Sequence, residues 1–217
     1  MTAPIMPPIT PFAHDAGEAW DLALATLTHD LRTPLASLLA LVELRRARAL
    51  SDGGFAEQVA DYASGALALA DDLTRLLRET CHAMAPRPLT PATLVESCVE
   101  RMSQRAFDAG VALGGCGPSC DMPVMADEGL LSEVLDVLAG RAIRACQPGG
   151  KVLLHWLAGP GEHLLHISFP PIAGEPAASM AAEGAALLFA RRVLARHGGT
   201  LAVLLEEGRS GWRVSLP

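Results

Sequence analysis

Two long segments of the chain repeat apolar residues at alternating steps of three and four. In the first segment these residues are Leu24, Leu27, Leu31, Leu35, Leu38 and Val42. In the second they are Phe55, Val59, Tyr62, Ala66, Leu69, Leu73 and Leu76. This spacing puts one apolar seam along an α-helix, and the turn residues Ser51-Asp52-Gly53-Gly54 separate the two seams. We therefore expect an antiparallel hairpin of two long helices, the first from about residue 18 to residue 49.

The hairpin cannot bury both seams by itself. A period of 3.5 residues is typical of helices that pack in a left-handed bundle. A second copy of the hairpin would complete a four-helix bundle around a twofold axis, so we expect a homodimer. The alternative is that the hairpin packs on the C-terminal half of its own chain.

Proline-rich stretches mark the expected domain boundaries. Prolines at positions 4, 7, 8 and 11 prevent a helix near the N-terminus, and residues 1–17 are expected to be a flexible leader. The sequence PRPLTP at residues 86–91 is expected to be a linker. We therefore expect a hairpin domain at residues 18–85 and a second domain at residues 86–217.

The second domain alternates between helical and extended patterns. Helices are expected at residues 91–108, 128–146 and 183–197. Strands are expected near 111–113 and 123–125, and as two hairpins at 152–158 with 163–169 and at 200–205 with 212–216. The first hairpin turns at Gly159-Pro160-Gly161, and Glu206-Glu207 is expected to be the turn of the second. Helices that are segregated from mostly antiparallel strands predict an α+β two-layer sandwich.

Composition excludes several classes of partner. The formal net charge is −7, so the chain offers no basic field for nucleic acid. No apolar stretch reaches the roughly 18 residues that span a bilayer, and the N-terminus lacks a secretory signal pattern. We expect no membrane insertion and a cytoplasmic protein.

The five cysteines are expected to be free thiols. Their number is odd and their spacing irregular, which fits a reducing compartment. Cys116 and Cys120 form a C-x₃-C pair that could be imagined as part of a zinc site with Cys98, Cys146 or His155. Zinc frameworks supply paired ligands and no second pair occurs, so no metal site is expected.

The segment Thr28-His29-Asp30-Leu31-Arg32-Thr33-Pro34-Leu35 resembles the phosphoacceptor box of sensor histidine kinases. The resemblance implies a dimerising helical hairpin whose histidine, here His29, accepts a phosphoryl group. It extends in order and length from about Trp20 to the C-terminus.

The chemistry of this segment can also be argued from helix geometry. His29 lies about 200° from Leu27 around the helix, so we expect its imidazole to face solvent opposite the seam. Asp30 could accept a hydrogen bond from one imidazole nitrogen of His29, which would leave the other nitrogen as the nucleophile. Pro34 cannot donate to the carbonyl of Asp30, so the helix should loosen there. Arg32 could contact phosphate, and Thr33 could position a hydrolytic water.

The second domain resembles the ATP-binding domain of histidine kinases, the Bergerat-type ATPase sandwich, but departs from it at several positions. Val137 and Arg141 stand where the family carries asparagines that bind Mg²⁺ and phosphate, and the chain contains no Asn. The segment around Ser168 replaces the family's adenine-binding Asp, since no Asp follows Asp136. The family also has a second Gly-rich turn, which opens the next helix. In this sequence Gly184 is the one glycine that is retained there. The resemblance therefore implies a degenerate nucleotide site.

The function that we favour is a histidine phosphotransferase of a two-component phosphorelay. His29 would accept and return phosphoryl groups from the aspartates of response-regulator receiver domains, without ATP or any other cofactor. One alternative is a divergent ATP-dependent histidine kinase that uses MgATP. A second is a non-catalytic module that binds receivers.

Overall fold

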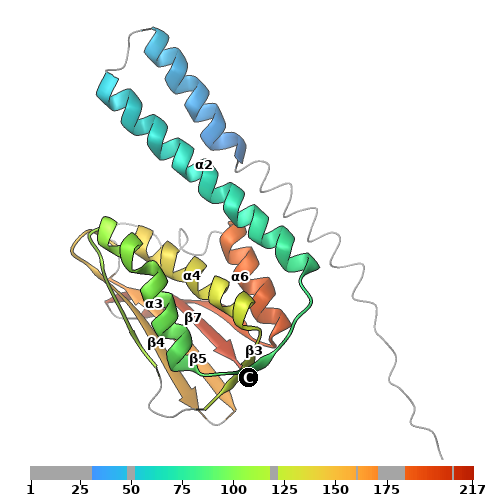
Figure 1. Cartoon of the computed structure of the whole chain (residues 1–217). Coiled ribbons are helices and arrows are strands. Elements are labelled where there is room, and N and C mark those ends of the chain that lie inside the picture. Colours follow the sequence, from blue (N-terminus) through green and yellow to red (C-terminus); the bar gives the residue numbers. More distant parts are fainter. Residues whose placement is uncertain (1–30, 48–51, 118–121, 160, 171–183, 207) are drawn as a thin grey trace, which may run out of the picture. The chain divides into compact units, whose positions relative to one another are not determined.

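The computed structural model describes residues 31–47, 52–117, 122–159, 161–170, 184–206 and 208–217 (Figure 1). The first helix covers residues 31–46 of this part. The other helices are α2 (Asp52–Cys81), α3 (Pro91–Asp108), α4 (Glu128–Ala145) and α6 (Ala185–Arg196). The strands are β1 (Arg87–Leu89), β2 (Ala112–Cys116), β3 (Val124–Ala126), β4 (Lys151–Gly159), β5 (Glu162–Phe169), β6 (Thr200–Glu206) and β7 (Arg209–Leu216). None of the described helices is long and apolar enough to cross a membrane.

The chain divides into two compact units, Met1–Asp71 and Asp72–Pro217. The expected domain boundaries at residues 17 and 85 stay a prediction. The predicted leader and the start of the first helix lie outside the described residues.

The first unit contains a helical hairpin, as the two seams predict (Figure 1). Leu41 is buried, and Pro34 and Leu38 are half-buried, so these residues form the inward stripe of the first helix. The expected turn at residues 51–54 is wrong in part, because α2 already begins at Asp52. Asp52, Gly53 and Gly54 thus belong to the first turn of α2. The dimeric four-helix bundle stays a prediction.

The second unit is an α+β sandwich, which confirms the predicted architecture. Its larger sheet has five strands in the order β2-β4-β5-β7-β6, with β2 and β4 parallel and the other pairs antiparallel. Helices α3, α4 and α6 lie on one face of this sheet (Figure 1). The row Leu154, Ile167, Trp212 and Val203 runs across the sheet on the helix side, and the first three are buried.

Two short segments differ from the expectation. The predicted linker contains β1, which pairs antiparallel with β3 and buries Leu89. Strands β1 and β3 form a sheet of only two strands, so the outer side of β1 has no neighbour that needs a backbone N–H. Pro88, which lacks an N–H, is therefore tolerated there. Glu206 belongs to β6, opposite Arg209, rather than to a turn.

The last ten residues of α2 belong to the second unit. Leu76 is fully buried there, and Glu79 is only 2% exposed. The end of the hairpin helix is therefore part of the core of the sandwich unit.

Candidate functional site

The phosphoacceptor segment is described only from Leu31 onward. His29 and Asp30 lie outside the described residues, and so does the loosening expected at the Asp30 carbonyl. Arg32 and Thr33, three and four residues after His29, are both exposed on the first helix, while Pro34 is half-buried. Residues three or four positions apart share one face wherever a helix is continuous, so the expectation that His29 lies on this face stays a prediction. In the described part of the segment, the two polar side chains are therefore at the surface.

Helix α4 carries the two positions at which the sequence lacks the expected asparagines. The side chain of Asp127 caps this helix by accepting the N–H of Leu130 at 3.1 Å, which fixes its start. Val137 is 7% exposed and lies in the apolar core. Val137 therefore offers no oxygen atom to a metal ion or a phosphate.

Arg141 follows Val137 by one helical turn and lies beside the start of α6. Its Nε is buried and has no hydrogen-bond partner within the part of the chain that the structure describes. A Cβ atom at Gly184, the N-cap of α6, would lie 3.8 Å from Nη1 of Arg141. Burial lowers the pKa of the Arg141 guanidinium, and the carboxylate of Asp72 opposes this effect.

Further arginines surround this position. Burial lowers the pKa of Arg144, and the neighbouring guanidinium groups of Arg105 and Arg141 add to the effect. Asp72 accepts from Arg75 at 2.9 Å. The cluster therefore carries a net positive charge, which favours anions and disfavours a divalent cation.

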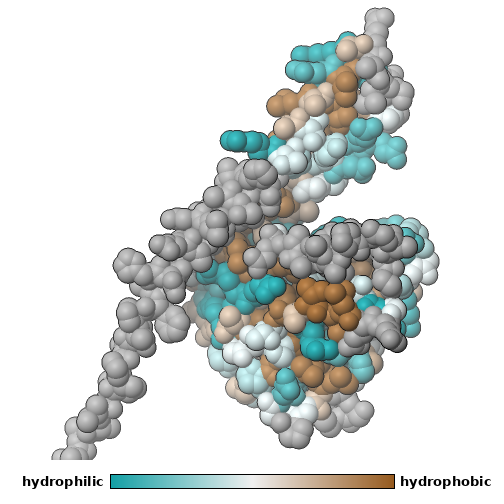
Figure 2. Space-filling view, turned by 180° about the vertical axis from the view of Figure 1, so that it is seen from behind, coloured by the Kyte–Doolittle hydropathy of each residue, from teal (hydrophilic) through white to brown (hydrophobic). Residues whose placement is uncertain are grey.

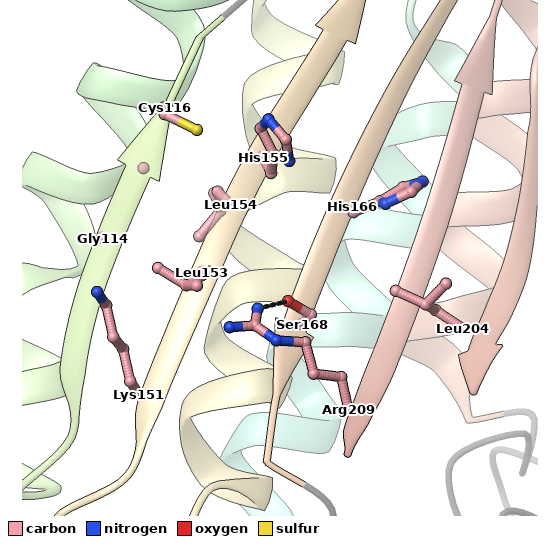
Figure 3. Close-up of a pocket in the computed structure, with 11 residues that line it drawn as sticks. Gly114, Cys116, Lys151, Leu153, Leu154, His155, His166, Ser168, Leu204 and Arg209 are labelled. Carbon is pink, nitrogen blue, oxygen red and sulfur yellow. Dashed lines mark hydrogen bonds between the residues drawn. The ribbon is translucent and has the colours of Figure 1, made fainter. Parts of the chain in front are cut away.

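Ser168 does not join the other positions that the sequence singled out. It lies on the sheet face opposite the helices, where its Oγ accepts from Nη1 of Arg209 at 2.7 Å (Figure 3). Val137, Arg141 and Gly184 lie on the helix side of the sheet. The four positions are thus divided between the two faces of the sandwich.

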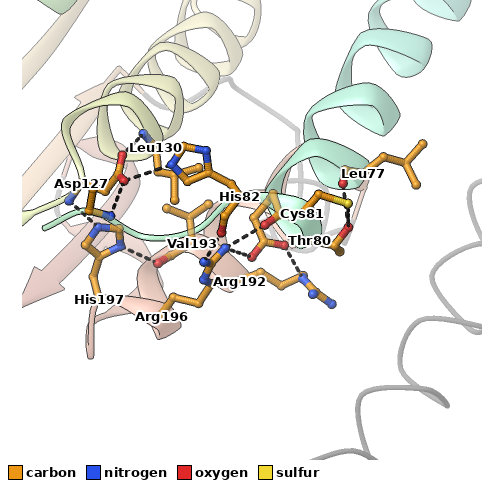
Figure 4. A network of polar contacts seen from close by, with 12 residues as sticks. Leu77, Thr80, Cys81, His82, Asp127, Leu130, Arg192, Val193, Arg196 and His197 are labelled. Atoms are coloured by element: carbon orange, nitrogen blue, oxygen red, sulfur yellow. Dashed lines mark hydrogen bonds and ion pairs between the residues drawn. The ribbon is translucent and has the colours of Figure 1, made fainter.

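A network that the sequence analysis did not predict ties the end of α2 to α6 (Figure 4). The buried carboxylate of Glu79 accepts from Nε of Arg192 and from Nη1 of Arg196, each at 2.9 Å. Arg196 also donates to the carbonyl of His82 at 2.6 Å. The i, i+4 spacing of Arg192 and Arg196 was a signal for a shared partner, but no pattern pointed to Glu79.

The same network continues to Asp127. Its carboxylate accepts from the backbone N–H of Ala85 at 2.9 Å and contacts Nε2 of His82 at 3.0 Å. Its own N–H donates to Nε2 of His197 at 2.9 Å, so Nδ1 of His197 donates to the carbonyl of Val193 at 2.7 Å. Asp127 thus links three segments: the chain after α2, the start of α4 and the end of α6.

Replacing Asp127 is expected to remove a pH-dependent part of the stability. Burial disfavours its charge, but hydrogen bonds from Ala85, Leu130 and His82 prevail and lower its pKa to about 2. The charged form therefore stabilises the fold above the unfolded pKa of about 4, and this contribution, about 1–2 kcal/mol, is lost as pH falls toward 2. The variant Asp127→Asn keeps a helix cap, so chemical denaturation from pH 7 to pH 2 should show the wild-type advantage shrinking to a small remainder at pH 2. An advantage that is constant with pH would contradict this assignment.

Sequence comparisons find no relative: no protein-family model matches the chain, and no curated protein does. Solved structures do match. The histidine kinase AdeS of Acinetobacter baumannii is 19% identical, with 87% of this chain and 96% of AdeS covered and a TM-score of 0.64. The histidine kinase ThkA, in its complex with the response regulator protein TrrA, is 16% identical, with 94% of this chain and 63% of that chain covered and a TM-score of 0.74.

Full-length ShkA, in complex with AMPPNP, is 27% identical, with a TM-score of 0.58. The match covers 89% of this chain but only 45% of ShkA, so this chain spans less than half of that protein. The matches to AdeS, ThkA and ShkA each cover 87% or more of this chain, whereas matches to catalytic domains of ThkA cover 62%. The described part of the chain therefore has the fold of histidine kinases, which are phosphoryl transferases.

Proposed function

We propose that the chain acts in two-component signalling as a histidine phosphotransferase. A nitrogen of His29 attacks the phosphorus of an aspartyl phosphate on a receiver domain, the P–O bond breaks and the aspartate leaves as carboxylate. A second receiver aspartate later takes the phosphoryl group from His29. The fold supports this proposal, and the ThkA structure was solved with a response regulator bound.

The observation that carries the proposal is the environment of Arg141. Mg²⁺ in nucleotide sites commonly takes a protein oxygen besides water and phosphate oxygens. The described residues do not fit such a site, because Val137 is apolar and buried and Arg141 places a cation beside Gly184. A phosphotransferase needs no ATP, since the aspartyl phosphate supplies the phosphoryl group.

The hairpin also offers surface for a second copy. Leu35, Leu39 and Val42 follow one another at steps of four and three, and they are 52%, 70% and 37% exposed. The inward stripe at Leu38 and Leu41 is separate from them. An apolar stripe that is left open supports the proposed homodimeric four-helix bundle, in which receivers would dock against Arg32, Thr33 and His29.

A divergent histidine kinase is the second candidate, because the matching structures are kinases and ShkA was solved with AMPPNP. The two candidates differ in the phosphoryl donor. One experiment compares radiolabelled MgATP with a radiolabelled phosphoreceiver under the same conditions.

We expect label on the protein from the phosphoreceiver and none from MgATP. Calorimetry should likewise show no MgATP binding up to about 1 mM, a free energy weaker than about −4 kcal/mol. The label should be stable in base and labile in acid, as expected for phosphohistidine. Self-labelling from MgATP would contradict the phosphotransferase proposal and support the kinase. Absence of label from either donor would contradict both.

A further inference from the structure

The sheet face opposite the helices contains a hollow of about 500 Å³ (Figure 3). Leu153 and Leu204 lie on its floor, in the cross-strand row that also contains Gly114, Ser168 and Gly211. The two glycines leave this row without side chains at two of its five positions. At position 211 a side chain would collide with the carbonyl oxygen of Ile167, so close strand packing keeps that position empty.

Basic side chains border the hollow on two sides. Lys151 lies at the start of β4 and Arg209 at the start of β7, while His155 and His166 face each other in register one row beyond the floor. Arg213 follows His166 in this row and donates to its Nε2 at 3.2 Å. Lys151 and His155 are four residues apart in one strand, which is about 13 Å.

The described residues identified in the lining include Lys151 and Arg209 but no carboxylate, and the nearest acidic position in the strand register is Glu206, opposite Arg209. This contrasts with the whole chain, whose net charge is −7. Lys151 is also the only lysine in the sequence. The hollow is therefore a local positive region on an acidic protein, and its potential favours an anion.

Arg209 is exposed, and a hydrogen bond fixes its guanidinium beside the hollow. Its Nη1 donates to Oγ of Ser168 at 2.7 Å, and Figure 3 shows the guanidinium reaching across to β5. Ser168 is only 4% exposed, so this contact anchors the arginine at a fixed point. Seen from behind, the sandwich has hydrophobic side chains beside hydrophilic ones (Figure 2).

We propose that this hollow binds a small organic anion with a flat ring and one phosphate group. The ring would cover the leucine and glycine floor, and the phosphate would contact Arg209 and Lys151. Guanidinium and ammonium groups are the side chains that bind phosphate best, and sites for small molecules combine an apolar surface with a few fixed polar groups. The volume of about 500 Å³ is in the range of such sites.

The test uses the full chain and three probes that separate the two parts of the ligand. FMN carries a flat ring and one phosphate, riboflavin has the same ring without the phosphate, and inorganic phosphate has no ring. Flavin fluorescence measures FMN and riboflavin binding, and calorimetry measures phosphate. We expect FMN to bind at least about tenfold more tightly than either of the other probes, the difference made by one charge-assisted contact.

Variants locate the binding on this face. The double variant Lys151→Ala with Arg209→Ala should lose at least about tenfold in FMN affinity and leave riboflavin binding unchanged. The matched control Arg141→Ala removes a cation from the helix side and should bind FMN as the wild type does. Circular dichroism of each variant reports whether the fold is retained.

The proposal fails if FMN shows no binding up to about 1 mM or binds no better than riboflavin. It also fails if Arg141→Ala removes the binding, because the ligand then lies on the helix side. If the double variant instead changes the oligomeric state and FMN does not bind, a second copy of the chain covers this face. None of these outcomes bears on phosphoryl transfer, because no residue of the hollow belongs to the proposed phosphoacceptor segment.

Discussion

His29→Gln is expected to abolish phosphoryl acceptance from a phosphoreceiver while the fold and the dimer stay intact. The amide offers no nitrogen of comparable basicity, so the nucleophile is lost. The spacing of His29 from Leu27 predicts that it faces solvent, so the replacement should remove no buried area and should change stability by at most about 0.5 kcal/mol. The measurement is transfer of label from a phosphoreceiver, with thermal unfolding and light scattering on the same samples.

Two neighbouring variants serve as controls for this experiment. Asp30→Asn should weaken transfer less, because it disturbs the orientation of the imidazole but keeps the nucleophile. Thr33→Ala should still accept label and should change mainly its loss by hydrolysis. Both keep the charge or size of the helix surface close to that of the wild type.

If the His29→Gln protein still carries label, another histidine is the acceptor. The structure argues against His197, which is 8% exposed and has both ring nitrogens bonded to the backbone, at Asp127 and Val193. His82 has its Nε2 on Asp127 but is 45% exposed, so it would be tested next.

The elements of the sandwich could be predicted because their local patterns agree with their packing. Helix α3 starts at Pro91, where a missing N–H costs nothing, and its predicted range matches the structure. The hairpin of β4 and β5 was predicted around Gly159 and Gly161, and the two strands pair antiparallel as expected.

Features that depend on distant contacts could not be predicted in the same way. Strand β1 forms because residues 87–89 pair with β3, which lies more than thirty residues later in the chain. The three residues have no strand pattern of their own. Glu79 lies on α2 without any local sign that it will be buried between Arg192 and Arg196 of α6. The hollow on the open face likewise arises from five strands, and no single strand contributes more than four of the residues that line it.

Leu39→Glu is expected to convert the proposed dimer into monomers. Leu39 is 70% exposed and lies in the centre of the outward stripe between Leu35 and Val42. A dimer carries the substitution twice, and burying each carboxylate should cost at least about 2 kcal/mol. Together these costs, about 4 kcal/mol, raise the dissociation constant roughly a thousandfold. Sedimentation or light scattering at micromolar concentration measures the change directly.

Leu44→Glu is the matched control, because it introduces the same charge on the same helix at another exposed leucine. Leu44 is 46% exposed and lies five residues after Leu39, which is about 140° around the helix. It therefore points away from the outward stripe, and its variant should remain dimeric. Neither leucine is buried, so helical content should be unchanged in both variants. A monomeric wild type would contradict the bundle, and equal dissociation by the two variants would show that the dimer does not form through the stripe at Leu35, Leu39 and Val42.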